Sequence, residues 1–203
     1  MVRNPVDLVY SYHSQLLYNV GEENEADFEK AWHLQQAREQ GKNMPPLCKS
    51  PATLQYKNIG SLGTQVEKLF SIFPREQVKV ILFDDFKAST QSVYEDVLSF
   101  LEVSNDHRTD FPQINKNRKH RFALLGKLTE KTPQAIVSQA NRIKGSLGIK
   151  SFGIANKVRD LNRVEFQRPP LLPEFRSYLA NEFKDEVLKL ADLINKDLNH
   201  WLE

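Results

Sequence analysis

An arginine and a serine near the start of the chain have the types and the spacing to bind a phosphate group. Arg3 precedes Asn4-Pro5, and Ser11 follows eight residues after Arg3. Asn4 is a good helix cap and Pro5 fits the first helical position, so a helix is predicted to begin there. Side chains on a helix lean toward its N-terminus, so Ser11 can reach back toward Arg3. A guanidinium fork with a hydroxyl suits a phosphate monoester; the alternative interpretation is an arginine ion pair beside a helix cap.

The rest of the sequence offers no self-sufficient catalytic motif. The turn Gly60-Ser61-Leu62-Gly63 lacks the lysine and the preceding strand of a phosphate-binding loop. The five histidines show no metal-ligand spacing, and the single cysteine, Cys48, excludes both an internal disulfide and a thiolate metal cluster. Asp84-Asp85 are adjacent, so they are expected to cap a helix rather than share a proton. No metal site is predicted.

The elements that must position Arg3 and Ser11 indicate an α/β fold. A helix is predicted over about 5–18, ended by Gly21, because apolar residues recur there at helical spacing. Val78–Phe83 is short, β-branched and nearly all apolar, which predicts a buried strand. The sequence predicts further helices in the first half of the chain over 24–40, 59–73 and 90–101. Helices that flank a strand in this way are typical of a mostly parallel sheet.

The second half of the chain is predicted to be helical and basic. Short helices are expected over His120–Lys131, Gln134–Leu147 and Ala155–Val164, followed by a long helix from Pro173. An apolar stripe marks one face of that last helix: Phe175, Leu179, Phe183, Val187, Leu190 and Ile194. We therefore predict a single domain over 1–203, with an α/β part over 1–104 and a basic helical part over 105–203.

Composition and charge exclude several classes of protein. The chain has 203 residues, 40% of them hydrophobic and 27% charged, which is typical of a globular domain with one sizeable core. It has no run of about 18 apolar residues, so a membrane span is not predicted, and no leader pattern, so a cytoplasmic location is expected. The net charge is +2, but residues 105–170 hold 14 basic and 5 acidic side chains. This segment either faces an anionic ligand or forms solvated helix faces.

The spacing of Arg3-Asn4-Pro5 and Ser11 resembles the 3′-phosphate-binding motif of sulfotransferases that use 3′-phosphoadenosine 5′-phosphosulfate (PAPS). The resemblance to bacterial members of this family continues in the same order along nearly the whole chain, over 60–86, 97–101, 111–122 and 197–202. It implies a layered α/β fold related to P-loop kinases. It also implies transfer of a sulfuryl group from PAPS to a hydroxyl or amine of a carbohydrate, lipid or small-molecule acceptor.

The resemblance also assigns roles to residues. Arg3 and Ser11 would bind the 3′-phosphate of the donor, although the family often has arginine where this chain has Leu8. Arg118 and Lys119, in the basic stretch 116–121, could cover the same phosphate, contact an acidic acceptor or lie in solvent. Acceptor contacts could fall on four other residues, for which packing is the favoured alternative: Tyr12, His13, Tyr56 and Lys57.

In the family, the 5′-phosphosulfate loop and the catalytic base precede the arginine motif. The resemblance therefore implies an N-terminally incomplete sulfotransferase in which no catalytic residue is assigned, and little or no transfer by this chain alone. Two other functions stay open. The basic segment 108–168 could make the chain a noncatalytic anion or nucleic-acid binder, although its aromatic residues are sparse. The stripe of the last helix could make it a helical interaction module.

Overall fold

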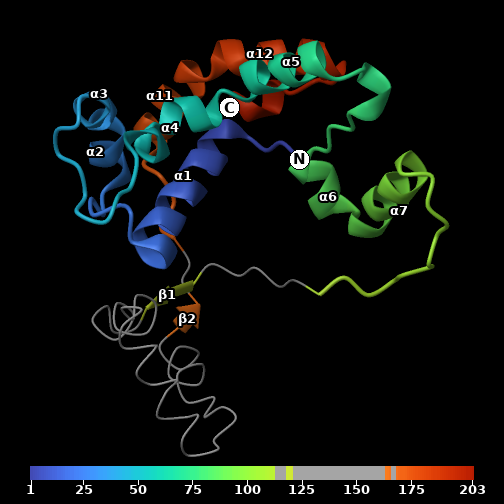
Figure 1. The fold of residues 1–203 in the computed structure, drawn as a ribbon, viewed down its shortest axis with the longest axis horizontal. Coiled ribbons are helices and arrows are strands. Elements are labelled where there is room, and N and C mark those ends of the chain that lie inside the picture. The colour runs from blue at the N-terminus through green and yellow to red at the C-terminus, as the bar shows by residue number, and fades with distance from the viewer. Residues whose placement is uncertain (113–117, 121–162, 166–167) are drawn as a thin grey trace, which may run out of the picture. The chain divides into compact units, whose positions relative to one another are not determined.

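A computed structural model of the chain describes the following residues (Figure 1): 1–112, 118–120, 163–165 and 168–203. The chain divides into two units, and the first combines Met1–Gln113 with Pro170–Glu203. The N-terminal and C-terminal helices therefore belong to one unit and share a core. The predicted single domain, with its division after residue 104, stays a prediction.

The second unit comprises Ile114–Pro169. Residues 118–120 and 163–165 of this unit form two short strands, β1 (Arg118–His120) and β2 (Arg163–Glu165), which pair antiparallel with His120 opposite Arg163. The helices predicted within this unit lie outside the described residues, except at two of their ends. His120 and Val164, the first and last residues of two of those predicted helices, lie in strands.

Helix α1 (Pro5–Gln15) begins and ends as its sequence predicts. The Asn4 side-chain oxygen accepts a hydrogen bond from the Val6 backbone N–H, and Pro5 occupies the first helical position. A π-helical turn continues α1 and ends at Gly21, which adopts a positive φ of 67° that glycine tolerates. The predicted helix over 5–18 is confirmed.

Two predicted single helices are each divided in the structure. The segment 24–40 forms α2 (Phe28–His33) and α3 (Gln35–Glu39), with Asp27 as the cap of α2. The segment 59–73 belongs to α4 (Tyr56–Gly60) and α5 (Leu62–Ile72). Of the apolar side chains along these segments, Phe28, Trp32, Leu62 and Val66 are buried, whereas Leu69 and Phe73 are exposed. Neither interruption was predicted.

The predicted strand Val78–Phe83 is wrong. Within the described residues, this segment pairs only at Leu82, which forms a parallel bridge with Val2. Val2 donates to the Ile81 carbonyl at 2.8 Å, and Phe83 donates to the Val2 carbonyl at 2.8 Å. Helix α6 (Phe83–Ala88) begins immediately afterwards. A run of β-branched residues becomes a strand only where neighbouring backbone pairs along it, and here one residue does so. The next helix, α7 (Thr90–Phe100), was predicted correctly.

The long C-terminal helix is also divided, into α11 (Pro173–Glu182) and α12 (Lys184–Ile194), before a short 3₁₀ turn at Asn199–Trp201. Its predicted stripe is confirmed at five of six positions, where the side chains are buried: Phe175, Leu179, Phe183, Val187 and Leu190. Helix α12 packs along α5, as Figure 1 shows. Gly63 permits this close approach, because a Cβ there would lie 2.5 Å from the Glu186 carbonyl oxygen.

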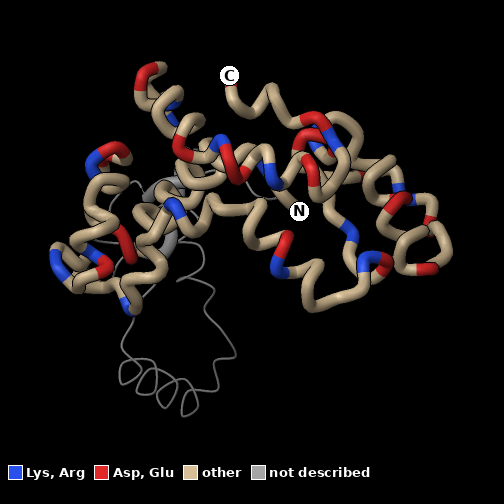
Figure 2. Tube along the Cα trace, turned by 90° about the horizontal axis from the view of Figure 1, so that it is seen from above, with Lys and Arg blue, Asp and Glu red and all other residues tan. Residues whose placement is uncertain are grey.

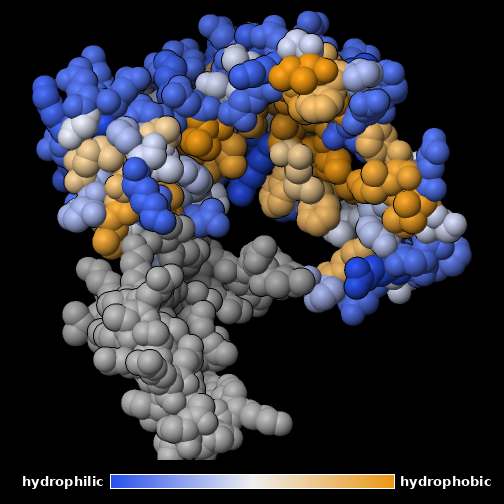
Figure 3. Space-filling view, viewed as in Figure 1, coloured by the Kyte–Doolittle hydropathy of each residue, from blue (hydrophilic) through white to orange (hydrophobic). Residues whose placement is uncertain are grey.

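The core of the first unit is rich in aromatic rings. Phe28 contacts Tyr56, Trp32 and Phe175 edge-on, and Trp32 contacts Phe183 in the same way. In the view of Figure 3, the outer side of α11 and α12 is mostly hydrophilic, and hydrophobic residues gather toward α6 and α7. Charges of both signs are interspersed over the described helices (Figure 2). None of the helices described is long and apolar enough to cross a bilayer.

Candidate functional site

The backbone at the start of α1 is fixed from two sides. The bridge between Val2 and Leu82 holds the residue before Arg3, and the Asn4 side chain holds the residue after it. The Asn4 amide oxygen caps α1, while its Nδ2 donates to the Trp201 carbonyl at 3.1 Å. Arg3 therefore projects from a short segment whose position is set by distant parts of the chain.

The Arg3 guanidinium is oriented by a ring and makes no hydrogen bond to the part of the chain that the structure describes. Its Cζ lies 4.9 Å from the centre of the Phe83 ring, in cation–π contact. Among the described residues its acidic partner is Asp7, at 3.9 Å between Nη2 and Oδ2, which is too long for a hydrogen bond. The side chain is 31% exposed. The alternative interpretation, an ion pair beside a helix cap, is thus present in a loose form that leaves the guanidinium available to an anion.

Asp7 has a closer partner than Arg3. Arg176, from helix α11, donates from Nη1 to the Asp7 Oδ1 at 2.9 Å. One carboxylate therefore lies between two guanidinium groups, one from the N-terminal segment and one from the C-terminal half of the chain. The Arg176 side chain is 37% exposed and makes no other hydrogen bond to a described residue.

Ser11 lies on α1 one turn beyond Asp7 and is half-buried. Residues four apart on a helix lie on the same face, so Ser11 shares the face on which Asp7 meets the two arginines. Its hydroxyl makes no hydrogen bond to any residue that the structure describes. The hydroxyl and the Arg3 guanidinium are thus both without a hydrogen-bonding partner among these residues, as a shared ligand would require.

Contacts from the end of the chain tie α6 to this segment. The Trp201 indole Nε1 donates to Asp84 Oδ2 at 2.6 Å, and Lys196 pairs with Asp85 at 2.7 Å. The predicted capping role of the two aspartates is wrong, because Leu82 is the cap of α6 and both lie in its first turn. The two aspartates instead bind Trp201 and Lys196, near the C-terminus. Asp84 directly follows Phe83, the ring that the Arg3 guanidinium contacts.

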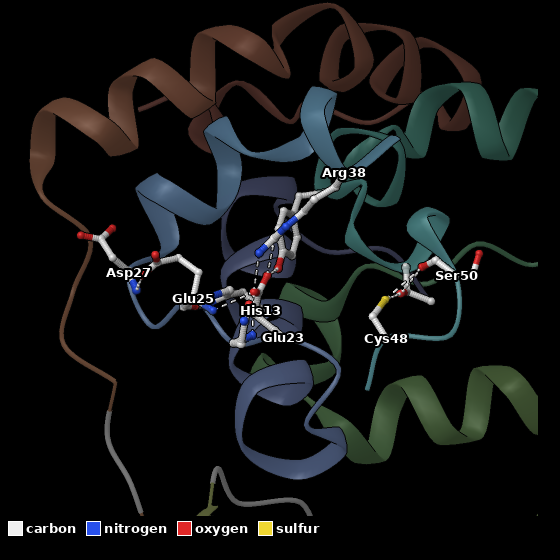
Figure 4. Close-up of polar contacts among 10 residues, drawn as sticks. His13, Glu23, Glu25, Asp27, Arg38, Cys48 and Ser50 are labelled. Carbon is white, nitrogen blue, oxygen red and sulfur yellow. Dashed lines mark hydrogen bonds and ion pairs between the residues drawn. The ribbon is translucent and has the colours of Figure 1, made fainter. Parts of the chain in front are cut away.

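A second polar cluster, buried beside α1, was missed by sequence reasoning (Figure 4). Glu23 and Arg38 form a bidentate pair with both distances at 2.7 Å and both side chains 0% exposed. The Tyr56 hydroxyl also donates to Glu23 at 2.5 Å. The predicted helix over 24–40 would place Glu23 just before its first turn, but α2 begins only at Phe28. Glu23 is instead the centre of a buried network.

Burial and hydrogen bonding shift the pKa values in this cluster. Burial opposes ionisation of Glu23, but hydrogen bonds from Arg38, Tyr56 and the Glu25 backbone outweigh it, so the pKa of the Glu23 carboxyl is lowered. Burial raises the pKa of the Tyr56 hydroxyl, and the hydrogen bond to the charged Glu23 raises it further. Burial lowers the pKa of His13, although its Nε2 bonds the Glu25 carbonyl at 2.8 Å. His13 is therefore favoured in its neutral form.

Packing roles are confirmed for two of the four residues weighed as acceptor contacts. Tyr56 is fully buried, and His13 is buried against the Phe28 and Tyr56 rings. Tyr12 is half-buried and contacts Tyr56 edge-on, and Lys57 pairs on the surface with Glu182 at 2.9 Å. None of these contacts indicates a role in binding the acceptor.

The remaining predicted ligands lie in the second unit. Arg118 and Lys119 occupy the first two positions of β1, and only their backbone is described. Their role toward a phosphate stays a prediction. Among the described residues, no group of side chains could hold a metal ion.

Two surface pockets of the first unit have linings other than Arg3 and Ser11. One, of about 350 Å³, is lined by Asn24, Glu25, Leu34, Arg38, Asn43 and Met44. The other, of about 560 Å³, is lined by Glu25, Asp27, Glu29, Lys30, His33 and Leu34. The acidic side chains of the second pocket do not favour a phosphate.

Comparison with known proteins gives two matches. The family model of the sulfotransferase domain matches residues 1–151. The crystal structure of a sulfotransferase from Alicyclobacillus acidocaldarius is similar over 100% of this chain, with a TM-score of 0.60 and 23% identity. This chain spans 56% of the length of that protein. No curated protein matches the sequence significantly. At this identity the structural likeness concerns the fold alone, which fits that of the solved sulfotransferase.

Proposed function

This chain belongs to the sulfotransferase domain family, a family of transferase enzymes, and we propose that it binds the 3′-phosphate of the sulfuryl donor through Arg3 and Ser11. The donor proposed is PAPS, and the acceptor is a hydroxyl or an amine. Transfer breaks the bond between the sulfur and the bridging oxygen of the donor. A new bond joins the sulfur to the acceptor oxygen or nitrogen, which loses its proton, and the nucleotide 3′,5′-bisphosphate leaves.

One observation carries the proposal. The Arg3 guanidinium is held at 4.9 Å over the Phe83 ring while it makes no hydrogen bond to any described residue. An arginine whose role was only to pair with Asp7 would be expected closer than the 3.9 Å found, with its fork engaged. A ring that orients the guanidinium lowers the entropy lost when an anion binds, and leaves the N–H groups along the edge of the guanidinium for phosphate oxygens.

The same arrangement suggests how the chain contributes to catalysis. The 3′-phosphate lies away from the sulfur that is transferred, so Arg3 and Ser11 would act by fixing the nucleotide rather than by stabilising charge at the reacting atoms. Fixing the donor holds its sulfur in line with the acceptor, which converts part of the binding free energy into rate. We propose no catalytic base among the described residues.

We also propose that Val2 and Leu82 belong to a parallel α/β layer related to that of P-loop kinases. Their bridge is parallel, and helices follow both segments directly, since α1 begins at Pro5 and α6 at Phe83. In parallel sheets, ligands bind beyond the carboxyl ends of strands, where helices begin. Arg3 occupies such a position after Val2, which supports its role in nucleotide binding.

Nucleotide binding tests the proposal directly. Calorimetric titration of the 203-residue chain with 3′-phosphoadenosine 5′-phosphate and with 5′-AMP compares ligands with and without the 3′-phosphate. We expect the bisphosphate to bind more tightly, and Arg3→Ala to weaken it by at least about tenfold while 5′-AMP changes little. Ser11→Ala should weaken the bisphosphate by a smaller factor, because a neutral hydroxyl contributes less than a guanidinium.

Arg75→Ala is the matched control. Arg75 also stacks on an aromatic ring, with its Cζ 4.2 Å from the centre of Phe70, but it is absent from the site proposed. Bisphosphate binding should survive this change. Equal affinity of the wild-type chain for the two nucleotides, or equal loss in the Arg3 and Arg75 variants, would refute the assignment of Arg3.

A further inference from the structure

We propose that Arg176, on helix α11, is a second cation for the same 3′-phosphate, an inference that rests on the function proposed above. The starting point is the carboxylate of Asp7, which lies 2.9 Å from Arg176 and 3.9 Å from Arg3. Two guanidinium groups therefore approach one small anion from opposite ends of the sequence. A phosphate, which is larger and carries more charge, can be shared by the same two groups.

Helix geometry places Asp7, the partner of Arg176, on the same face of α1 as Ser11. Asp7 and Ser11 lie four residues apart on α1 and so share a face. Because Arg176 binds Asp7, which also lies 3.9 Å from Arg3, its guanidinium reaches the face of α1 that carries Ser11. The proposed site thus combines Arg3, Ser11 and Arg176 at one face of α1.

The charge balance of the site favours a second cation beside Arg3. Arg3 alone next to Asp7 carries no net charge, and the carboxylate would repel an incoming phosphate. Arg176 brings the three side chains to a net charge of about +1, which makes the face attractive to an anion. It uses one hydrogen bond on Asp7 and leaves its other donors free of described partners. With 37% of the side chain exposed, a ligand can reach them.

The position of Arg176 is fixed by packing. The preceding residue, Phe175, is buried against Phe28 in the aromatic core. The Arg176 backbone N–H bonds the Leu172 carbonyl at 2.9 Å in the first turn of α11. The guanidinium is therefore presented by a rigid helix, as a preorganised binding group would be.

The test compares the same two nucleotides in variants of the 203-residue chain. We expect Arg176→Ala to weaken 3′-phosphoadenosine 5′-phosphate about tenfold and 5′-AMP less than about twofold, since a partly exposed charge-assisted contact is lost only for the former. Arg176→Lys should restore part of the affinity. The control is Lys189→Ala, which also removes one positive charge and a cross-helix ion pair, with Glu67 at 3.2 Å, and should leave both affinities unchanged.

An Asp7→Asn background separates direct contact from neutralisation of Asp7. If Arg176 contacts the phosphate, Arg176→Ala still costs about tenfold there. Loss of the effect in that background overturns the proposal, as does equal weakening of both nucleotides. Should the alanine variant fail to fold by circular dichroism, Arg176→Gln, which keeps a donor for Asp7, gives the same comparison. Failure of the underlying function has a different signature, because wild type would then bind the two nucleotides equally.

Discussion

The buried pair of Glu23 and Arg38 makes a strong prediction about stability. Replacing Arg38 by methionine removes two hydrogen bonds of 2.7 Å and leaves the Glu23 carboxylate with the Tyr56 hydroxyl and two backbone N–H groups. Both side chains of the pair are 0% exposed, so water cannot take the place of the guanidinium. Breaking such a pair costs about 3–5 kcal/mol, because one charge is left buried and uncompensated.

The dependence on pH distinguishes this explanation from a simple packing defect. In the wild type the pKa of Glu23 lies below its ordinary value of 4.5, so its ionisation contributes stability above that pH and the contribution is lost as pH falls through the lower folded value. Without Arg38 the pKa of Glu23 rises. The deficit of the variant should therefore be largest at neutral pH and should shrink as the carboxyl takes up a proton.

Urea unfolding followed by circular dichroism, between about pH 4 and pH 7.5, measures the deficit. Tyr56→Phe serves as a graded comparison, with an expected cost of about 1.5–3 kcal/mol for one hydrogen bond to a charged group. The double variant Glu23→Leu with Arg38→Met should recover most of the loss, because neither charge then remains buried. A deficit below about 1 kcal/mol, or one that is constant with pH, would refute the reasoning.

Three further predictions follow from the described contacts. Gly63→Ala should destabilise the fold by about 1–3 kcal/mol, because a Cβ 2.5 Å from the Glu186 carbonyl oxygen forces α5 and α12 apart. The comparison in thermal unfolding is Gly41→Ala, whose Cβ would meet nothing within 4 Å but whose φ of 76° is strained, so it measures backbone strain without crowding. Burial lowers the pKa of His13 from its ordinary value of 6.5, so the neutral ring contributes stability above pH 6.5 and that contribution is lost as pH falls. His13→Gln should therefore reduce the loss of stability between about pH 7 and pH 5. An unchanged dependence of the unfolding free energy on pH would contradict this. Trp201→Phe removes the hydrogen-bond donor to Asp84 and should lower the unfolding free energy by about 1 kcal/mol, because Asp84 is 44% exposed and water partly replaces the indole. Asp84→Asn keeps an acceptor and should cost less in the same denaturation assay.

Sequence reasoning succeeded where the determinants are local. The cap at Asn4, the proline that follows it and the positive φ of Gly21 are set by the residues themselves, so both ends of the first helix were predicted. The apolar stripe of the C-terminal helices was predicted for the same reason. The break at Phe183 was not, because the stripe keeps its phase across a single residue that leaves helical geometry.

Sequence reasoning failed where a residue's partners lie far away in the sequence. Val78–Phe83 has the composition of a strand, but a strand exists only through its neighbours, and among the described residues only Val2 pairs with it. Glu23 resembles any acid before a helix, and its burial depends on Arg38 and Tyr56, which lie 15 and 33 residues away. No periodicity indicates such a network, because Glu23 and Arg38 each lie in a polar stretch of the sequence, 21–27 and 35–42.

The candidate site combines both situations. Arg3 and Ser11 were predicted from a spacing of eight residues, whereas Arg176 lies 169 residues from Asp7 and Trp201 lies 197 from Asn4. If Arg176 binds the phosphate, the role of Asp7 also changes. In the absence of the nucleotide, two guanidinium groups on one face repel each other, and the carboxylate between them keeps both turned toward the same point. A phosphate then meets two cations already in place, at the cost of the repulsion from one partly exposed carboxylate. Asp7 would thus improve the geometry of the site while it limits its affinity, which is why the Asp7→Asn background is the informative one.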